Sequence, residues 1–162
     1  MRYLYILTII LATSIYANSY NKIELSETKK ELSYEIFKKL EKEHYLRKID
    51  KDNLNSQYFE AIFDRLDKNK NYFIANEVQK YLIKSKTNEV SNFDIELAYD
   101  LINLYFERLI EYSEFQINLI QTVDFDFTKD EYLDIFYEDN QWLTNFTDLK
   151  DLWRLETKND LL

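Results

Sequence analysis

Apolar residues recur at helical spacing through most of this chain. Between residues 23 and 48 they stand amid glutamate and lysine, at Leu25, Leu32, Ile36, Leu40 and Tyr45. This spacing predicts one long amphipathic helix. After a polar break at 48–53, the stretch 54–66 carries a second apolar stripe, formed by Leu54, Tyr58, Phe59, Ile62, Phe63 and Leu66. We therefore expect a second helix directly after the first.

The middle of the chain predicts two more helices. The polar run DKNKN at 67–71 indicates a loop, and a helix should follow it because Val78, Tyr81 and Leu82 share one face. That helix should end at SKTNE, residues 85–89. Ser91 with Asp94 three residues later is typical of a capping box, and from 93 to 120 the pattern stays helical without an obvious break.

The last part of the chain carries a further helical stripe. Thr128 and Glu131 form the pattern of another capping box, and the apolar side chains near the end lie at helical spacing: Trp142, Phe146, Leu149 and Trp153. The chain has no glycine and no proline, which favours helices over the tight turns of a sheet. We expect an all-α fold, with residues 18–162 forming a single all-helical domain.

The first 17 residues form the pattern of a signal peptide. Arg2 precedes an uncharged run from Tyr3 to about Thr13, and a small residue, Ala17, stands at the expected cleavage site. The run is too short for a membrane span of about 20 apolar residues, although an uncleaved anchor is the alternative. We expect an exported protein of bacterial type, periplasmic or secreted, that does not associate with a membrane after cleavage.

Composition narrows the functions that are open to the chain. The net charge is −9, and loss of residues 1–17 removes one cation and no acid, which makes it −10. Such a surface disfavours nucleic acid and suits cations or a basic protein, so another exported protein is a candidate partner. Without glycine, the usual glycine-rich phosphate-binding loops are excluded, and without cysteine there is no thiolate chemistry. The one histidine, His44, lies in a charged stretch. We do not expect an enzyme.

Oxygen donors alternate along the predicted loop after residue 66. Asp67, Asn69 and Asn71 occupy alternate positions, and Glu77 stands where the next helix begins. Calcium takes six to eight oxygen ligands, commonly from such a loop and its closing acid. The segment 63–82 resembles an EF-hand, the helix–loop–helix calcium motif. The resemblance implies that Asp67, Asn69, Asn71 and Glu77 are calcium ligands.

The segment differs from the EF-hand pattern at two positions, and a second copy of the pattern follows it in the chain. Tyr72 stands where the EF-hand family has glycine, and Glu77 comes one residue early. Shifting the pattern by 36 and then 37 residues aligns it with a second segment at 103–114, so an EF-hand-like pair is expected at about 54–120. One continuous helix over 93–120 is the competing interpretation.

A second set of oxygens lies at 124–131. Asp124, Asp126 and Glu131 resemble the closing half of another calcium loop and form a secondary candidate metal site; an ordinary helix start capped by Thr128 is the alternative. The leading hypothesis is an exported EF-hand-like protein with weak or vestigial calcium binding at 67–77. The alternatives are a metal-free helical protein–protein interaction module and, third, a carboxylate-based hydrolase.

Overall fold

The computed structural model describes residues 20–43, 51–87, 94–133 and 141–162. Within these ranges the regular structure is helical throughout. The five helices are α2 (Glu27–Lys42), α3 (Lys51–Leu66), α4 (Ala75–Thr87), α5 (Ile95–Thr122) and α6 (Phe146–Asp160). The all-α prediction is confirmed. The proposed signal peptide at 1–17 and the candidate His44 lie outside the described residues.

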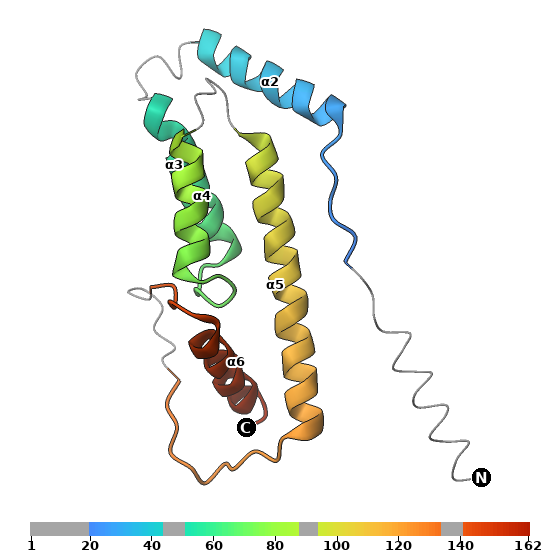
Figure 1. Cartoon of the computed structure of the whole chain (residues 1–162), viewed down its shortest axis with the longest axis vertical. Coiled ribbons are helices and arrows are strands. Elements are labelled where there is room, and N and C mark those ends of the chain that lie inside the picture. The colour runs from blue at the N-terminus through green and yellow to red at the C-terminus, as the bar shows by residue number, and fades with distance from the viewer. Residues whose placement is uncertain (1–19, 44–50, 88–93, 134–140) are drawn as a thin grey trace, which may run out of the picture.

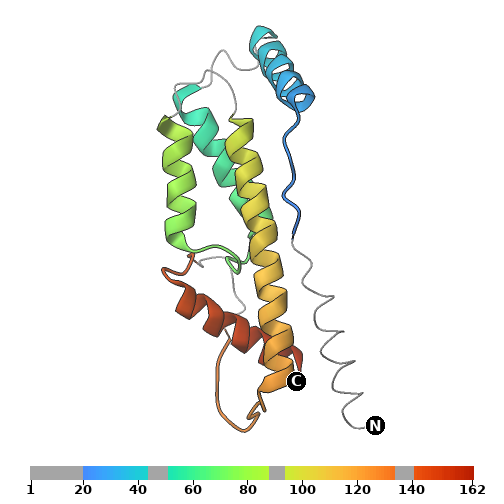
Figure 2. The same cartoon turned by 45° about the vertical axis from the view of Figure 1, so that its right-hand side comes forward.

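The helix α5 is the longest element and has two sets of partners. Its 28 residues span about 42 Å at the usual rise of an α-helix. The hairpin of α3 and α4 lies beside one half of α5, and α6 packs beside the other half (Figures 1 and 2). The loop that joins α3 to α4 therefore faces α6, and this places residues 67–74 between the two halves of the molecule.

Two apolar clusters follow from this arrangement. The larger one is made by the hairpin and the first turns of α5, with the buried side chains Phe59, Phe63, Phe73, Val78, Leu97, Ala98 and Leu101. The smaller one is made by Ile74, Leu149 and Trp153, against which Tyr112 and Phe115 of α5 pack. Phe73 and Ile74 are neighbours in the chain but belong to different clusters, so the α3–α4 loop is shared by both.

The N-terminal segment 20–26 runs beside α5 and is held there by one buried amide. The Asn103 side chain accepts hydrogen bonds from the Tyr20 hydroxyl at 2.6 Å and the Ile23 backbone N–H at 2.7 Å. The same amide donates to the Ile23 carbonyl oxygen at 3.1 Å. Because α2 follows this segment directly, the contacts at Asn103 help to place α2 across the end of the bundle (Figure 1).

Several predicted boundaries change. The first helix begins at Glu27 rather than 23, and its described part ends at Lys42. Asp94 is itself the N-cap of α5, where its carboxylate accepts the Leu97 N–H at 2.9 Å, while Ser91 lies outside the described residues. The segment 103–114 lies inside α5, so the second helix–loop–helix is not formed and the continuous-helix alternative is confirmed.

The capping box predicted at Thr128 is also not formed. Residues 127–133 are turn, bend and irregular chain, and Thr128 donates both its N–H and its hydroxyl to Asp126. The last helix begins at Phe146 after the N-cap Asn145, so Trp142 precedes it. The Trp142 ring instead packs against the larger cluster, where it meets Phe63 edge-on.

Candidate functional site

Asp67, the predicted first calcium ligand, is the centre of the α3–α4 loop. It follows the last residue of α3 and is only 1% exposed. Its carboxylate accepts backbone N–H groups from Asn71 at 2.6 Å, Tyr72 at 3.2 Å and Phe73 at 3.1 Å. These hydrogen bonds hold the loop against the end of α3. They are charge-assisted, and such hydrogen bonds stabilise a buried carboxylate.

A side chain from far along the chain completes this arrangement. The indole Nε1–H of Trp142 donates to the Asp67 carboxylate at 2.9 Å. The Lys70 ammonium lies 3.7 Å from the centre of the Trp142 ring and also pairs with Asp64 at 3.0 Å. Lys70 has φ of 60°, the left-handed region that favours glycine, so these two contacts hold a residue in a costly conformation.

The two predicted asparagine ligands diverge. Asn69 is exposed at the tip of the loop. Asn71 is buried, donates its side-chain N–H to the Glu156 carboxylate, and accepts the Trp153 indole N–H on its backbone carbonyl at 2.6 Å. Among the described residues no donor reaches the Asn71 side-chain oxygen. Asn71 therefore fastens the loop to α6.

Glu77, the predicted closing ligand, is turned toward a guanidinium. One of its oxygens accepts the Ile74 backbone N–H at 3.2 Å, which is half of a capping box at the start of α4. The other pairs with Arg108 of α5. Arg108 also binds Glu111 at 2.8 Å and lies 4.4 Å above the ring of Phe146. This ion pair connects α4 and α5 and contacts the start of α6.

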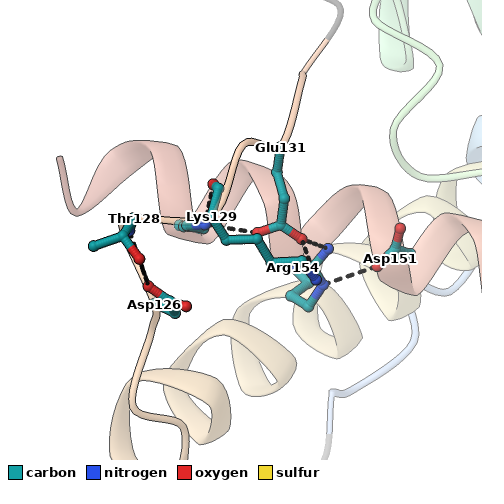
Figure 3. A network of polar contacts seen from close by, with 7 residues as sticks. Asp126, Thr128, Lys129, Glu131, Asp151 and Arg154 are labelled. Carbon is teal, nitrogen blue, oxygen red and sulfur yellow. Dashed lines mark hydrogen bonds and ion pairs between the residues drawn. The ribbon is translucent and has the colours of Figure 1, made fainter.

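Figure 3 shows how the secondary candidate site is used. Glu131 accepts hydrogen bonds from Arg154 at 2.8 Å and from Lys158 at 2.6 Å. These contacts lower its pKa to about 2, with the Lys158 ammonium as the largest cause. Asp126 accepts the Thr128 hydroxyl and N–H, and both contacts lower its pKa. Asp124 is exposed. The segment 123–133 is thereby fastened to α6.

A buried acid that the sequence analysis did not single out lies behind the loop. Glu156 of α6 is 9% exposed, accepts hydrogen bonds from Asn71 and from the Tyr112 hydroxyl at 3.3 Å, and has its pKa raised by burial. Burial and, next, the neighbouring Glu156 carboxylate also raise the pKa of Tyr112. Glu156 stands three residues after Trp153 on the inward face of α6. An acid at that position of an apolar stripe could have predicted a buried carboxylate from the sequence.

An open apolar surface lies elsewhere, between α2, α3 and α5. A groove of about 430 Å³ has the apolar stripe of α2 on one side and Tyr58, Ile95 and Tyr99 on the other. Phe37 forms its buried part, while Leu32, Ile36 and Leu40 remain 56%, 51% and 38% exposed. This groove has the apolar, partly open character of a binding surface for polypeptide.

The fold and these sites define a class of protein before any comparison. The polar groups of the described interior hold loops against helices, and no group of three acidic or histidine side chains that would bind a metal occurs within the described ranges. An open apolar groove also lies between α2, α3 and α5. The structure is thus that of a helical domain with a candidate protein-binding groove.

Comparison with known families supplies the identity. Residues 36–162 match the family described as "Tail specific protease N-terminal domain", and the chain belongs to this family. The match runs from the second half of α2 to the end of the chain and includes all of α3, α4, α5 and α6. No curated protein matches this chain.

This match overturns the leading hypothesis. The prediction of an EF-hand-like calcium-binding protein is wrong, because the family is that of a protease domain and the described residues contain no metal-binding group. The geometry gives the physical reason. Of the four primary candidate ligands, Asp67, Asn71 and Glu77 are directed at protein donors, and only Asn69 faces solvent. The alternating oxygen-bearing residues after α3 include Asp67, whose carboxylate binds the backbone of its own loop.

The described helices also bear on membrane association. None of them combines the length and the apolar character that a crossing would require.

Proposed function

We propose that this chain is a non-catalytic, protein-binding helical domain that acts together with a tail-specific protease outside the cytoplasm. The observation that carries the proposal is the family match, which extends over 36–162 and so over nearly all of the described helical structure. The family description names the N-terminal domain of such a protease and does not name its protease domain. A supporting role is therefore the first expectation for this chain.

The interior supports a non-catalytic role. Catalytic acids and bases need a site where a substrate atom comes within hydrogen-bond reach. Asp67 is enclosed by backbone N–H groups and Trp142, and Glu156 lies behind Asn71 and Tyr112. Both side chains are at least nine-tenths buried. Their positions suit a fastening function, since each joins the α3–α4 loop to a segment distant in sequence.

Export rests on the first 17 residues. The single cation, the short apolar run and Ala17 form the pattern of a cleaved signal. Fractionation of producing cells should place the protein in the periplasm or medium, and mass spectrometry should find Asn18 as the first residue. Recovery of the uncleaved chain in the membrane fraction would instead favour the anchor alternative.

The central experiment uses the chain from Asn18 onward, which retains every described residue. Incubated alone with an unfolded protein, it should release no fragments in a mass-spectrometric assay. Calorimetry should detect binding to the protease region of a tail-specific protease from the same source. As a control for charge alone, an unrelated helical protein of similar size and net charge should give no heat.

Two results would contradict this function. Fragment release by the chain alone, at a rate proportional to its concentration and retained after repeated purification, would make it an enzyme. Absence of both binding and any change in the kcat/KM of the protease, up to about 1 mM of chain, would remove the supporting role; affinities weaker than this contribute less than about 4 kcal/mol of binding free energy.

A further inference from the structure

The apolar stripe of α2 is only half covered by its own domain. Leu32, Ile36 and Leu40 stand one helical turn apart and are between 38% and 56% exposed, although they line the groove against α3 and α5. Side chains four residues apart share a face, so these three form a continuous strip. An apolar strip on an otherwise acidic surface is typical of a contact for another polypeptide.

The charges beside this strip are ordered along the helix. The sequence of α2 holds five lysines and four glutamates, so α2 is slightly basic in a chain of net charge −9. On one flank of the strip, the first half of α2 carries the acids Glu27, Glu31 and Glu35. The second half carries the cations Lys38, Lys39 and Lys42. The charge of this flank thus changes sign near the middle of the helix.

The two lysines in the acidic half are occupied by the domain itself. Lys30 pairs with Glu27 at 3.2 Å and with Glu96 at 2.8 Å, and Lys29 lies 5.5 Å from the centre of the Tyr99 ring. By contrast, no ion pair between described residues engages Glu31, Glu35, Lys39 or Lys42. These four charges are available in the described structure to select a partner.

We propose that the occupant of this surface is a second copy of the chain, with the two α2 helices antiparallel. A two-fold axis between the helices brings the same flank of each helix together with its direction reversed. The acidic half of one flank then meets the basic half of the other, while Leu32 of one copy lies near Leu40 of its partner. Flanking charges select orientation in this way in coiled coils.

The charge order favours a second copy over other occupants. A parallel two-fold arrangement would instead bring this flank against the opposite flank of the partner helix, which does not carry the same order of charges, so the flank would find no matched partner there. A uniformly basic partner would be repelled by the lysine half of the flank, and a uniformly acidic partner would be repelled by the glutamate half. Only a partner with the reversed order satisfies the whole flank, and an antiparallel copy supplies it without further assumptions.

The test begins with sedimentation equilibrium on the chain from Asn18 onward. The average mass should rise with concentration toward that of a dimer, and Ile36→Glu should weaken association at least tenfold. Ile117→Glu is the matched control, because Ile117 is 55% exposed on α5 far from the groove, and it should associate as the unmodified chain does. Circular dichroism should show that both variants fold, since each replaces an exposed side chain.

Charge-reversal variants test the antiparallel arrangement directly. The variants E31K/E35K and K39E/K42E should each be monomeric at low salt, because positions 31, 35, 39 and 42 then all carry one sign and repel the same positions of a second copy. An equimolar mixture of the two should form a heterodimer. A monomer at every concentration, association that Ile36→Glu and Ile117→Glu weaken equally, or charge variants that dimerise alone and gain nothing on mixing would each overturn the proposal. This proposal stands apart from the protease-related role, whose assay uses a different partner.

Discussion

At the scale of single residues, several buried polar groups from distant parts of the chain meet at the α3–α4 loop. Asp67 binds three backbone N–H groups and the Trp142 indole, and Asn71 binds Glu156 and receives the Trp153 indole. Both tryptophans therefore donate their only polar hydrogen to this loop. The polar run at 67–71 correctly predicted a loop, but the sequence assigned Asp67 and Asn71 to calcium. It did not show their partners, which lie 75 or more positions further along the chain.

The first residue-scale prediction concerns the charge of Asp67. Asp67→Asn keeps the shape but replaces one oxygen by a donor facing buried N–H groups, so we expect a loss of about 3 kcal/mol in the free energy of unfolding. The measurement is urea unfolding at pH 7 with an unchanged m-value. Asp64→Asn is the control, because the Asp64 side chain is 70% exposed and its pair with Lys70 is worth less than about 1 kcal/mol. Equal losses in the two variants would refute the role assigned to Asp67.

At the scale of elements, helical periodicity was sufficient to locate α3 and α4 but not to separate one helix from two. The 36- and 37-residue offsets that predicted a second helix–loop–helix fall inside α5, which is continuous over Ile95–Thr122. Any two amphipathic helices share matches at such offsets because both repeat every 3.6 residues. The capping box predicted at Thr128 is wrong because spacing alone does not name the partners: Thr128 binds Asp126, and Glu131 binds Lys158 of α6.

An element-scale prediction follows from the pKa of Glu131. It is lowered from 4.5 to about 2 in the folded chain, so the contact with α6 stabilises the fold above about pH 4.5 and loses this contribution as the pH falls to 2. Glu131→Gln should therefore unfold at lower urea concentration than the unmodified chain at pH 7. The difference should shrink steadily between pH 4.5 and pH 2.

The control for this prediction is Asp151→Asn, which removes the exposed partner of Arg154. It should give a smaller difference at pH 7, because the Asp151 side chain is 59% exposed and water screens the pair. A Glu131→Gln difference that stays constant from pH 7 to pH 2 would show that packing, not charge, holds the segment. The pH dependence contributed by Glu156 has the opposite sign. Burial raises the pKa of Glu156, so its protonation at lower pH favours the folded state.

At the scale of the whole molecule, the α3–α4 loop joins two apolar clusters that the sequence presented as separate stripes. Phe73 enters the larger cluster and Ile74 the smaller one, while Asp67 and Asn71 bind Trp142 and Trp153 beside them. The all-helical architecture could be predicted because it depends on local periodicity. The joining of the clusters depends on contacts between distant segments, and a pattern along the chain does not carry that information.

The joining of the clusters predicts that they unfold together. Trp142 packs on the larger cluster and Trp153 lies in the smaller one, so Trp153→Phe and Trp142→Phe leave one fluorescent reporter in each. Both reporters and far-UV circular dichroism should give the same urea midpoint within each variant, as expected for one cooperative unit. Leu149→Ala, added to each, empties a fully buried position of the smaller cluster and should cost about 3 kcal/mol. If the clusters are coupled through the loop, the Trp142 reporter must register that loss as fully as the Trp153 reporter. A shift confined to Trp153 would mean that the two halves of α5 support independent units.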